Sequence, residues 1–180
     1  RESLRDIIST VDRLERWTGS LLAYLHPLKP QLSRVVLSQV LDGALAPLQQ
    51  RLREKQMQVA LALPPAPLTM MADEHLLEQG FYNLLLNAID ASPAGSSIEI
   101  RAEAAPAEVR ITIRDEGPGM PFTPNPGDLS PGPSTKRFGT GLGIPFAFKV
   151  CEALGGKLSY DPAPQGGTLV TVLGVVAMAA

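Results

Sequence analysis

Cysteine, histidine and aromatic residues are scarce in this chain, and no apolar stretch is long enough to cross a bilayer. The single cysteine, Cys151, excludes an internal disulfide and fits a reducing compartment such as the cytoplasm. The net charge of −2 leaves no basic field that would hold a nucleic acid or an anionic membrane. The N-terminus does not look like a signal peptide. Within the 180 residues given, these absences argue against a disulfide scaffold, a nucleic-acid binder and a membrane-spanning helix.

What the chain does contain is enough apolar surface for a core, since 44% of its 180 residues are hydrophobic. This length suggests one domain plus an appendage. The appendage is residues 1–25, in which apolar residues repeat in sevens at Leu4, Ile7, Val11, Leu14, Thr18, Leu21 and Leu25. The repeat predicts one long helix that packs against a partner helix from the parent protein or a second subunit, with folding back onto its own domain as the alternative. Because the chain opens at Arg1 inside this pattern, we expect it to be a piece of a longer protein.

The remaining residues alternate between strand and helix patterns, which predicts a two-layer α/β sandwich with a mixed, mostly antiparallel sheet and three helices. Helices are expected at 37–54, at 141–154 and after an N-cap at Asp73. Strands are expected at 34–36, 57–63, 68–71, 97–104, 109–115, 157–160 and 168–176. Residues 117–145 contain seven prolines and seven glycines, a composition typical of a long surface loop.

Two asparagines four residues apart, Asn83 and Asn87, interrupt an otherwise apolar helical segment. Asn is a poor residue inside a helix, and together with Gln79 the asparagines form one stripe of amides. The packing side of the same helix is carried by Leu77, Phe81, Leu84, Leu85 and Ile89. A stripe of amides is costly unless something polar fills it. Two interpretations stay open from these residues alone: the amides hold a polar ligand, or they bond to neighbouring loops.

Three further motifs lie at the edges of the expected elements. Asp115-Glu116-Gly117-Pro118-Gly119-Met120 ends a strand, where a carboxylate can accept from an exocyclic amine and glycines let a planar ring approach; alone it is also an ordinary turn. Gly139-Thr140-Gly141-Leu142-Gly143 begins a helix, whose free N–H groups can hold phosphate oxygens, although it lacks the P-loop ending and the dinucleotide spacing. Lys136-Arg137 precedes it, as a solvated pair or as a partner of that phosphate.

Taken in order, these motifs resemble the sensor histidine kinases, a branch of the ATPase superfamily that includes gyrase, Hsp90 and MutL. Residues 83–88 resemble their N box, residues 115–120 their first glycine box and residues 139–143 the second. Ser134-Thr135-Lys136 is similar to the Thr-Thr-Lys of the nitrogen-regulatory subgroup, and Gly167-Thr168 to a step in the late hairpin. The resemblance covers roughly residues 34–176.

The resemblance implies that residues 31–180 are an ATP-binding catalytic domain and that residues 1–30 are the C-terminal helix of the dimerisation and phosphotransfer hairpin plus a linker. The domain would transfer the γ-phosphoryl of Mg-ATP to a histidine on the protein's own phosphoacceptor helix, upstream of these residues. From there the phosphoryl would pass to a response-regulator receiver domain. The parent protein would be a cytoplasmic homodimer, with anchoring in the inner membrane left open, and no nucleic acid is implied as a partner.

The family's residue roles carry over to matching positions. Asp115 would bind the adenine amine, Asn87 would ligate Mg²⁺, and Asn83 would support that ion or the phosphates. Asn83 and Lys136 are therefore the candidate catalytic residues. The other residues implied to contact ATP are Ala91, Gly117, Gly119 and Met120 around the purine, with Gly139, Thr140, Gly141, Leu142, Gly143 and Thr168 around the rest of the nucleotide.

The chain also departs from the family. Asp90 and Ala91 stand where many members have a phosphate-binding Lys and an adenine-stacking Tyr, so more of the phosphate charge falls to Lys136. Gly132-Pro133 replaces the paired phenylalanines of the lid. Neither His26 nor His75 is followed by the acidic turn of a phosphoacceptor, so both are expected to be surface or packing residues.

Two alternative functions remain. An ATP hydrolase of the gyrase or Hsp90 type needs a glutamate one turn before the asparagine region, but Gln79 stands there and Glu78 points about 100° away around the helix. A docking module that no longer uses ATP is favoured by the altered lid. The retention of both asparagines, Asp115 and the glycines argues against it.

Overall fold

The main sheet has five strands in the order β2-β4-β5-β7-β6. This computed structural model describes residue 18 and residues 27–104, 108–124 and 141–175. β2 and β4 run parallel, whereas every other neighbouring pair in the sheet is antiparallel. The strands are β2 (Gln58–Ala62), β4 (Ser97–Ala104), β5 (Val109–Arg114), β6 (Lys157–Pro162) and β7 (Thr168–Val175). The predicted mixed, mostly antiparallel sheet is confirmed.

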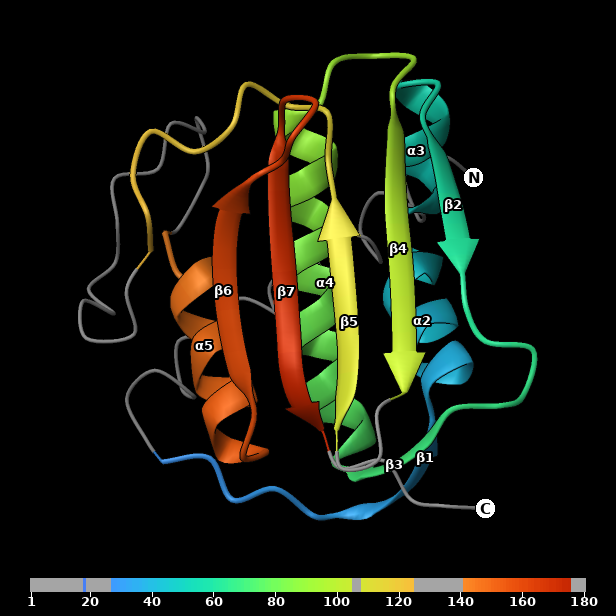
Figure 1. Cartoon of the computed structure of the whole chain (residues 1–180), viewed down its shortest axis with the longest axis vertical. Coiled ribbons are helices and arrows are strands. Elements are labelled where there is room, and N and C mark those ends of the chain that lie inside the picture. Colours follow the sequence, from blue (N-terminus) through green and yellow to red (C-terminus); the bar gives the residue numbers. More distant parts are fainter. Residues whose placement is uncertain (1–17, 19–26, 105–107, 125–140, 176–180) are drawn as a thin grey trace.

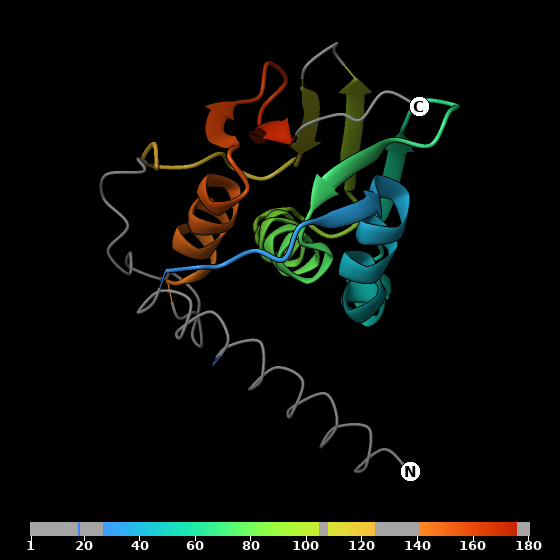
Figure 2. The same cartoon turned by 90° about the horizontal axis from the view of Figure 1, so that it is seen from below.

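The helices cover one face of this sheet, so the domain has two layers (Figure 1, Figure 2). α4 crosses behind β5 and β7, with α5 on one side of it and α2 and α3 on the other (Figure 1). The bounds are α2 (Leu37–Leu45), α3 (Gln49–Glu54), α4 (Glu74–Ala91) and α5 (Gly143–Ala153). The predicted helix at residues 1–25 lies outside the described residues except for Thr18, which is helical.

The prediction of one unbroken helix at 37–54 was wrong. A 3₁₀ turn, η1 (Ala46–Leu48), separates α2 from α3 and carries Pro47. Proline has no N–H to donate and its ring clashes with the carbonyl four residues earlier, so it breaks a helix interior. Leu48 and Leu52 are nevertheless buried, which explains why the apolar spacing continued across the break.

A second, two-stranded sheet joins the chain ahead of α2 to the segment ahead of α4. β1 (Ser33–Val36) and β3 (Thr69–Ala72) pair antiparallel, a pairing that the sequence did not predict. Just before β1, the backbone N–H of Gln31 donates to Oδ2 of Asp73 over 2.8 Å. Asp73 also caps α4 as predicted, because its Oδ1 accepts from the backbone N–H of Leu76.

The core lies between the sheet and α4. Alternate residues of β4 and β5 are buried toward the helices, as the period of a strand requires. The five α4 residues predicted to form its packing side are all buried, among them Leu85 and Ile89 with no exposed surface. In the described residues, no helix is long and apolar enough to cross a membrane.

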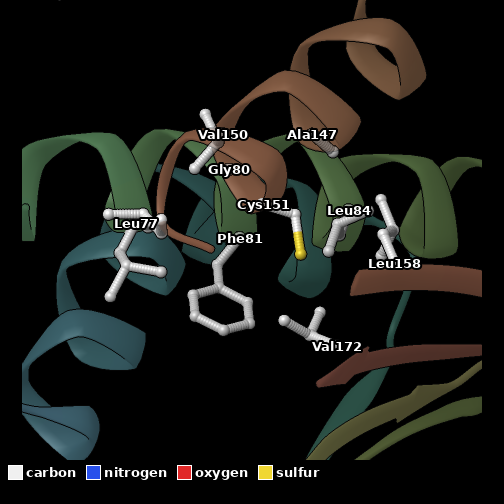
Figure 3. A pocket seen from close by; sticks show the side chains of 10 residues that line it. Leu77, Gly80, Phe81, Leu84, Ala147, Val150, Cys151, Leu158 and Val172 are labelled. Atoms are coloured by element: carbon white, nitrogen blue, oxygen red, sulfur yellow. The ribbon is translucent and has the colours of Figure 1, made fainter. Parts of the chain in front are cut away.

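A small cavity of about 20 Å³ remains between α4, α5, β6 and β7. Its apolar lining includes Phe81 and Leu84 of α4 and Cys151 of α5, whose sulfur points between the two helices and the strands (Figure 3). We call the region around this cavity, together with Phe148 and Tyr160, the apolar compartment. The rings of Phe148 and Tyr160 pack with centroids 5.8 Å apart.

Two weakly acidic groups, the Cys151 thiol and the Tyr160 hydroxyl, are buried in the apolar compartment. Burial raises the pKa of the Cys151 thiol from 9.0 to about 12, so the thiol stays protonated at neutral pH. Burial also raises the pKa of Tyr160, with a smaller contribution from Cys151. The Tyr160 hydroxyl is buried and has no hydrogen-bond partner in the described part of the chain.

Candidate functional site

The polar stripe of α4 faces the first residues of α5. Residue 143 is a glycine at the start of α5, and a Cβ there would lie 3.5 Å from Nδ2 of Asn87 and 3.7 Å from Oδ1 of Asn83. The amide Nδ2 of Asn83 is buried and has no hydrogen-bond partner among the residues that the structure describes. A buried donor without a partner lowers the stability of the fold by about 1–3 kcal/mol, so the presence of this amide requires an explanation. The two asparagines and the α5 N-terminus therefore form one polar surface, on which Nδ2 of Asn83 can still donate a hydrogen bond.

Asp115 follows β5 directly and is held in one orientation by backbone groups. It is only 4% exposed. Its Oδ1 accepts from the backbone N–H of Gly117 over 2.8 Å and from that of Thr168 over 3.1 Å. Its own N–H donates to the carbonyl of Thr168 over 3.0 Å. Both side-chain bonds formed within the described residues use Oδ1, so Oδ2 is the oxygen available to a ligand.

The backbone around Asp115 leaves no room for side chains at two glycines. A Cβ on Gly117 would lie 3.0 Å from Oδ1 of Asp115 and from Cβ and O of Ala91 at the end of α4. Gly167 has a φ of 92° and a Cβ on it would collide with the backbone carbonyl of Asp115. Glycine is the residue that tolerates both conditions. The backbone next to Asp115 is thus in close contact with the end of α4 at Gly117 and with the residue before β7, Gly167.

The start of α5 supplies backbone donors on the opposite side of the site. Gly141 has a φ of 68°, a left-handed conformation that turns the chain into Leu142 and Gly143. The first turn of α5 contains no acidic residue, so the partial positive charge of its N-terminus is not offset locally. Such a terminus favours an anion.

These elements converge at one end of the sheet. The end of β5, the start of β7 and the C-terminal half of α4 meet at the upper edge in Figure 1, with the N-terminal end of α5 beside them. The structure describes eleven of the predicted site residues there: Asn83, Asn87, Ala91, Asp115, Gly117, Gly119, Met120, Gly141, Leu142, Gly143 and Thr168. Lys136, Gly139 and Thr140 lie outside the described residues, and so do Arg137 and the Ser134-Thr135 motif. The ligand roles of all these residues stay predictions.

Two contributions at this end were missed by sequence reasoning. Lys55, at the end of α3, reaches the C-terminal carbonyls of α4, and no local pattern indicated it. The close approach of Gly167 to Asp115 was also missed, although the Gly167-Thr168 motif itself is visible in the sequence. Asp90 is turned away from the site toward Arg51 of α3, with 2.8 Å between Nη2 and Oδ1.

The residues weighed as alternatives lie elsewhere. The side chain of Glu78 packs on Gly43 of α2, where a Cβ would collide with its carboxylate. It therefore faces away from the asparagine stripe. His75 is exposed at the start of α4, as expected of a surface histidine, while His26 lies outside the described residues. In the described ranges, no three His, Cys, Asp or Glu side chains gather to hold a metal ion.

The curated relatives of this chain are sensor proteins and kinases. It is 26% identical over 174 residues to the C4-dicarboxylate transport sensor protein DctB of Rhizobium meliloti, covering 96% of this chain and 28% of that protein. It is 33% identical over 147 residues to DctS of Rhodobacter capsulatus, covering 79% and 22%, and 30% identical over 161 residues to the sensor histidine kinase ZraS of Klebsiella oxytoca, covering 89% and 35%. The chain thus spans about a fifth to a third of the length of these relatives.

Solved structures with the same fold include histidine kinases. Full-length ShkA in complex with AMPPNP superposes with a TM-score of 0.75 at 23% identity, covering 100% of this chain and 39% of ShkA. The mycobacterial sensor histidine kinase MprB gives a TM-score of 0.69 at 23% identity, covering 83% of this chain and 100% of that one. The predicted two-layer fold is confirmed by these matches. Residues 72–175 match the family described as histidine kinase-, DNA gyrase B- and HSP90-like ATPases, and the chain belongs to that family.

Proposed function

We propose that this chain is the ATP-binding catalytic part of a two-component sensor histidine kinase. One observation carries the proposal: a buried, backbone-oriented carboxylate, Asp115, lies at the end of the sheet that the C-terminal part of α4 reaches, and the polar stripe of this helix includes an amide, that of Asn83, without a hydrogen-bond partner among the described residues. A purine amine and a phosphate tail match these two features. The relatives named as a transport sensor protein and as a sensor histidine kinase support the same assignment.

In this proposal, Asp115 recognises adenine. Oδ1 is occupied by the N–H groups of Gly117 and Thr168, so Oδ2 accepts from the exocyclic amine. Gly117, Gly119 and Met120 border the ring, and Ala91 contributes a small wall where Tyr would stack in many relatives. The fixed backbone of this pocket favours purines that carry an amine over purines that carry an oxo group at the same position.

The phosphates lie along the amide stripe and the N-terminus of α5. Asn83 and Asn87 face this terminus, and Gly143 keeps the space between them free of a side chain. The second glycine box and Lys136 complete the phosphate contacts, and Asn83 with Lys136 carries the catalytic role. The chain's task is to position and to neutralise charge, because phosphoryl transfer requires little covalent chemistry from the protein.

The residues present fit a magnesium ion held at Asn87. A hard cation accepts one or two side-chain oxygens and takes its other ligands from phosphates and water, which a single carboxamide at the phosphate end of α4 allows. When bound, Mg²⁺ would neutralise phosphate charge. Asn83 beside it has the unpartnered amide that a phosphate oxygen could satisfy.

The parent protein extends this proposal. Residues 1–30 are assigned to the dimerisation hairpin and linker, and residues 31–180 to the catalytic domain. A homodimer would present an upstream phosphoacceptor helix to the ATP, and a response-regulator receiver domain would take the phosphoryl group. These steps place the domain in the cytoplasm. The position of Glu78 against α2 favours this function over a water-activating ATP hydrolase, because no carboxylate joins the asparagine stripe from that residue.

The test is nucleotide calorimetry on the chain and on Asp115→Asn. The unaltered chain should bind ADP with Mg²⁺. Asn keeps an oxygen for the two backbone donors but presents an NH₂ group to the purine amine, so binding should weaken at least about 100-fold, or about 2.7 kcal/mol. Asp161→Asn, at an exposed residue of β6, is the matched control and should bind as the unaltered chain does. Equal binding by Asp115→Asn would contradict the adenine role and favour a docking module.

A further inference from the structure

The side chain of Lys55, which is not part of α4, forms hydrogen bonds with the C-terminal turn of that helix. Lys55 follows α3, and its half-buried ammonium donates to the carbonyls of Ile89 and Ser92 over 2.6 Å each and of Asp90 over 3.3 Å. The last carbonyls of a helix have no partners within the helix. A cation at this end also compensates the negative end of the helix dipole. One ammonium therefore satisfies three carbonyls of a turn that would otherwise fray.

The backbone of the same residue holds the loop that follows. The carbonyl of Lys55 accepts from the N–H of Gly95 over 2.9 Å, so residues 89–95 are bonded to Lys55 at both ends. Nearby, Arg51 of α3 pairs with Asp90, whose side chain is 12% exposed. The carbonyl of Ala88, also in the last turn, accepts locally from the N–H and hydroxyl of Ser92. These contacts fix the end of α4 against α3.

Ala91 lies within the turn that Lys55 holds, and it forms one side of the candidate purine pocket. Its Cβ and carbonyl are so close to Gly117 that a Cβ there would lie 3.0 Å from each of them. Gly117 in turn donates to the Asp115 carboxylate. A displacement of the α4 terminus would therefore reach Asp115 through two close contacts. Lys55 lies outside residues 72–175, the part that matches the ATPase family.

We propose that Lys55 is a positioning residue for adenine recognition, which acts by fixing Ala91 against Gly117 and Asp115. This inference rests on the proposed function, because it requires that adenine binds at Asp115. It assigns Lys55 no contact with the nucleotide. Its effect must then fall on the adenosine end of the ligand and be the same whatever the number of phosphates.

The experiment measures dissociation constants of AMP, ADP and ATP for Lys55→Met, with and without Mg²⁺. Methionine keeps the apolar stem and removes the three donors. Binding of each nucleotide should weaken about tenfold, which is about 1.4 kcal/mol, and the ratio of affinities with and without Mg²⁺ should not change. Lys55→Arg, which restores donors at the same place, should recover most of the loss. Lys157→Met, at an exposed residue of β6, is the matched control and should bind normally.

The outcomes separate this inference from the proposed function. If the unaltered chain binds no adenine nucleotide, both are overturned. If it binds and Lys55→Met binds equally well, only the role of Lys55 is overturned. Weakening that grows with phosphate number would also overturn it, since that pattern places the effect at the phosphate end. Should Lys55→Met fail to fold, Lys55→Gln keeps one amide donor and is expected to lie between Met and the unaltered chain.

Discussion

Two regions beside α4 each contain a buried polar group that has no hydrogen-bond partner among the described residues. In the candidate site the group is the amide Nδ2 of Asn83, and in the apolar compartment it is the hydroxyl of Tyr160. The surroundings differ. Around Asn83 lie Asn87, the N-terminus of α5 and a glycine that leaves space, whereas Tyr160 packs against the ring of Phe148.

The difference indicates what each unsatisfied group does. A cost of about 1–3 kcal/mol attaches to each of them. For Asn83 a ligand can recover that cost, because Asn87 and the N-terminus of α5 lie beside it and bind polar groups. For Tyr160 nothing in the described surroundings can, since its neighbours are apolar. We expect the Asn83 amide to be functional and the burial of the Tyr160 hydroxyl to be only a consequence of how the core packs. The four predictions below test this distinction, from the largest expected effect to the smallest.

The largest effect is expected from the pair of adjacent glycines before β7. In Gly167→Ala the new Cβ would collide with the carbonyl of Asp115 at a φ of 92°, so the chain should lose about 3 kcal/mol or more of unfolding free energy and its nucleotide binding. Gly166→Ala is the control, because its φ is 89° but nothing lies within 4 Å of the new Cβ. It should lose only about 1–2 kcal/mol. Chemical denaturation measures both, and equal losses would show that the approach to Asp115 is not tight.

Asn83→Leu should separate stability from binding. Leucine is a better helix former and removes the unsatisfied donor, so the unfolding free energy should stay equal or rise by about 1 kcal/mol. Binding of Mg-ADP should weaken at least about tenfold, because a polar phosphate contact is lost. Denaturation and calorimetry on one preparation measure both quantities. A variant that loses stability yet binds normally would make Asn83 a structural residue.

The sequence predicted most elements because local physics determines them. Asp73 caps α4 through a bond three residues away, and β4 and β5 alternate buried and exposed residues as half-buried strands do. The break at Pro47 could have been predicted from the absent N–H, but the apolar spacing across it outweighed that signal. Strand pairing between β1 and β3 depends on how distant segments meet, so it could not.

The candidate site divides in the same way. Asn83, Asn87 and Asp115 were visible because a polar residue in an apolar helix and an acid at a strand end are local anomalies. The contribution of Lys55 was not visible, since its partners lie 34 to 37 residues away and a lysine at a helix end is ordinary. The constraint on Gly167 likewise exists only once β7 lies beside Asp115.

Tyr160→Phe should stabilise the protein without touching the site. It removes a buried hydroxyl that has no partner and keeps the ring packed against Phe148. The expected gain is about 1 kcal/mol, or about 2–4 °C in melting temperature for a protein of this size. Nucleotide affinity should stay unchanged, in contrast to Asn83→Leu. A loss of stability would mean that the hydroxyl has a partner, such as a buried water molecule, in solution.

The smallest effect concerns the pH dependence of the apolar compartment. Burial raises the pKa of the Cys151 thiol from 9.0 to about 12, so between these values the unfolded chain releases a proton that the folded chain keeps. The unfolded state is therefore favoured as pH rises, and the thiol contributes little pH dependence below about pH 8. Linkage predicts a loss of about 1 kcal/mol between pH 9 and pH 10.

Cys151→Ala should remove that slope, although the smaller side chain lowers stability at every pH by enlarging the cavity. Tyr160→Phe is the control, because the pKa of Tyr160 is raised from 10.0 and its linkage acts mainly above that pH. It should keep the slope between pH 9 and pH 10. Denaturation curves at these pH values decide the matter: an unchanged slope in Cys151→Ala would show that the thiol is ionised as readily in the folded chain as in the unfolded one. The apolar compartment would then admit water, and its contrast with the candidate site would be lost.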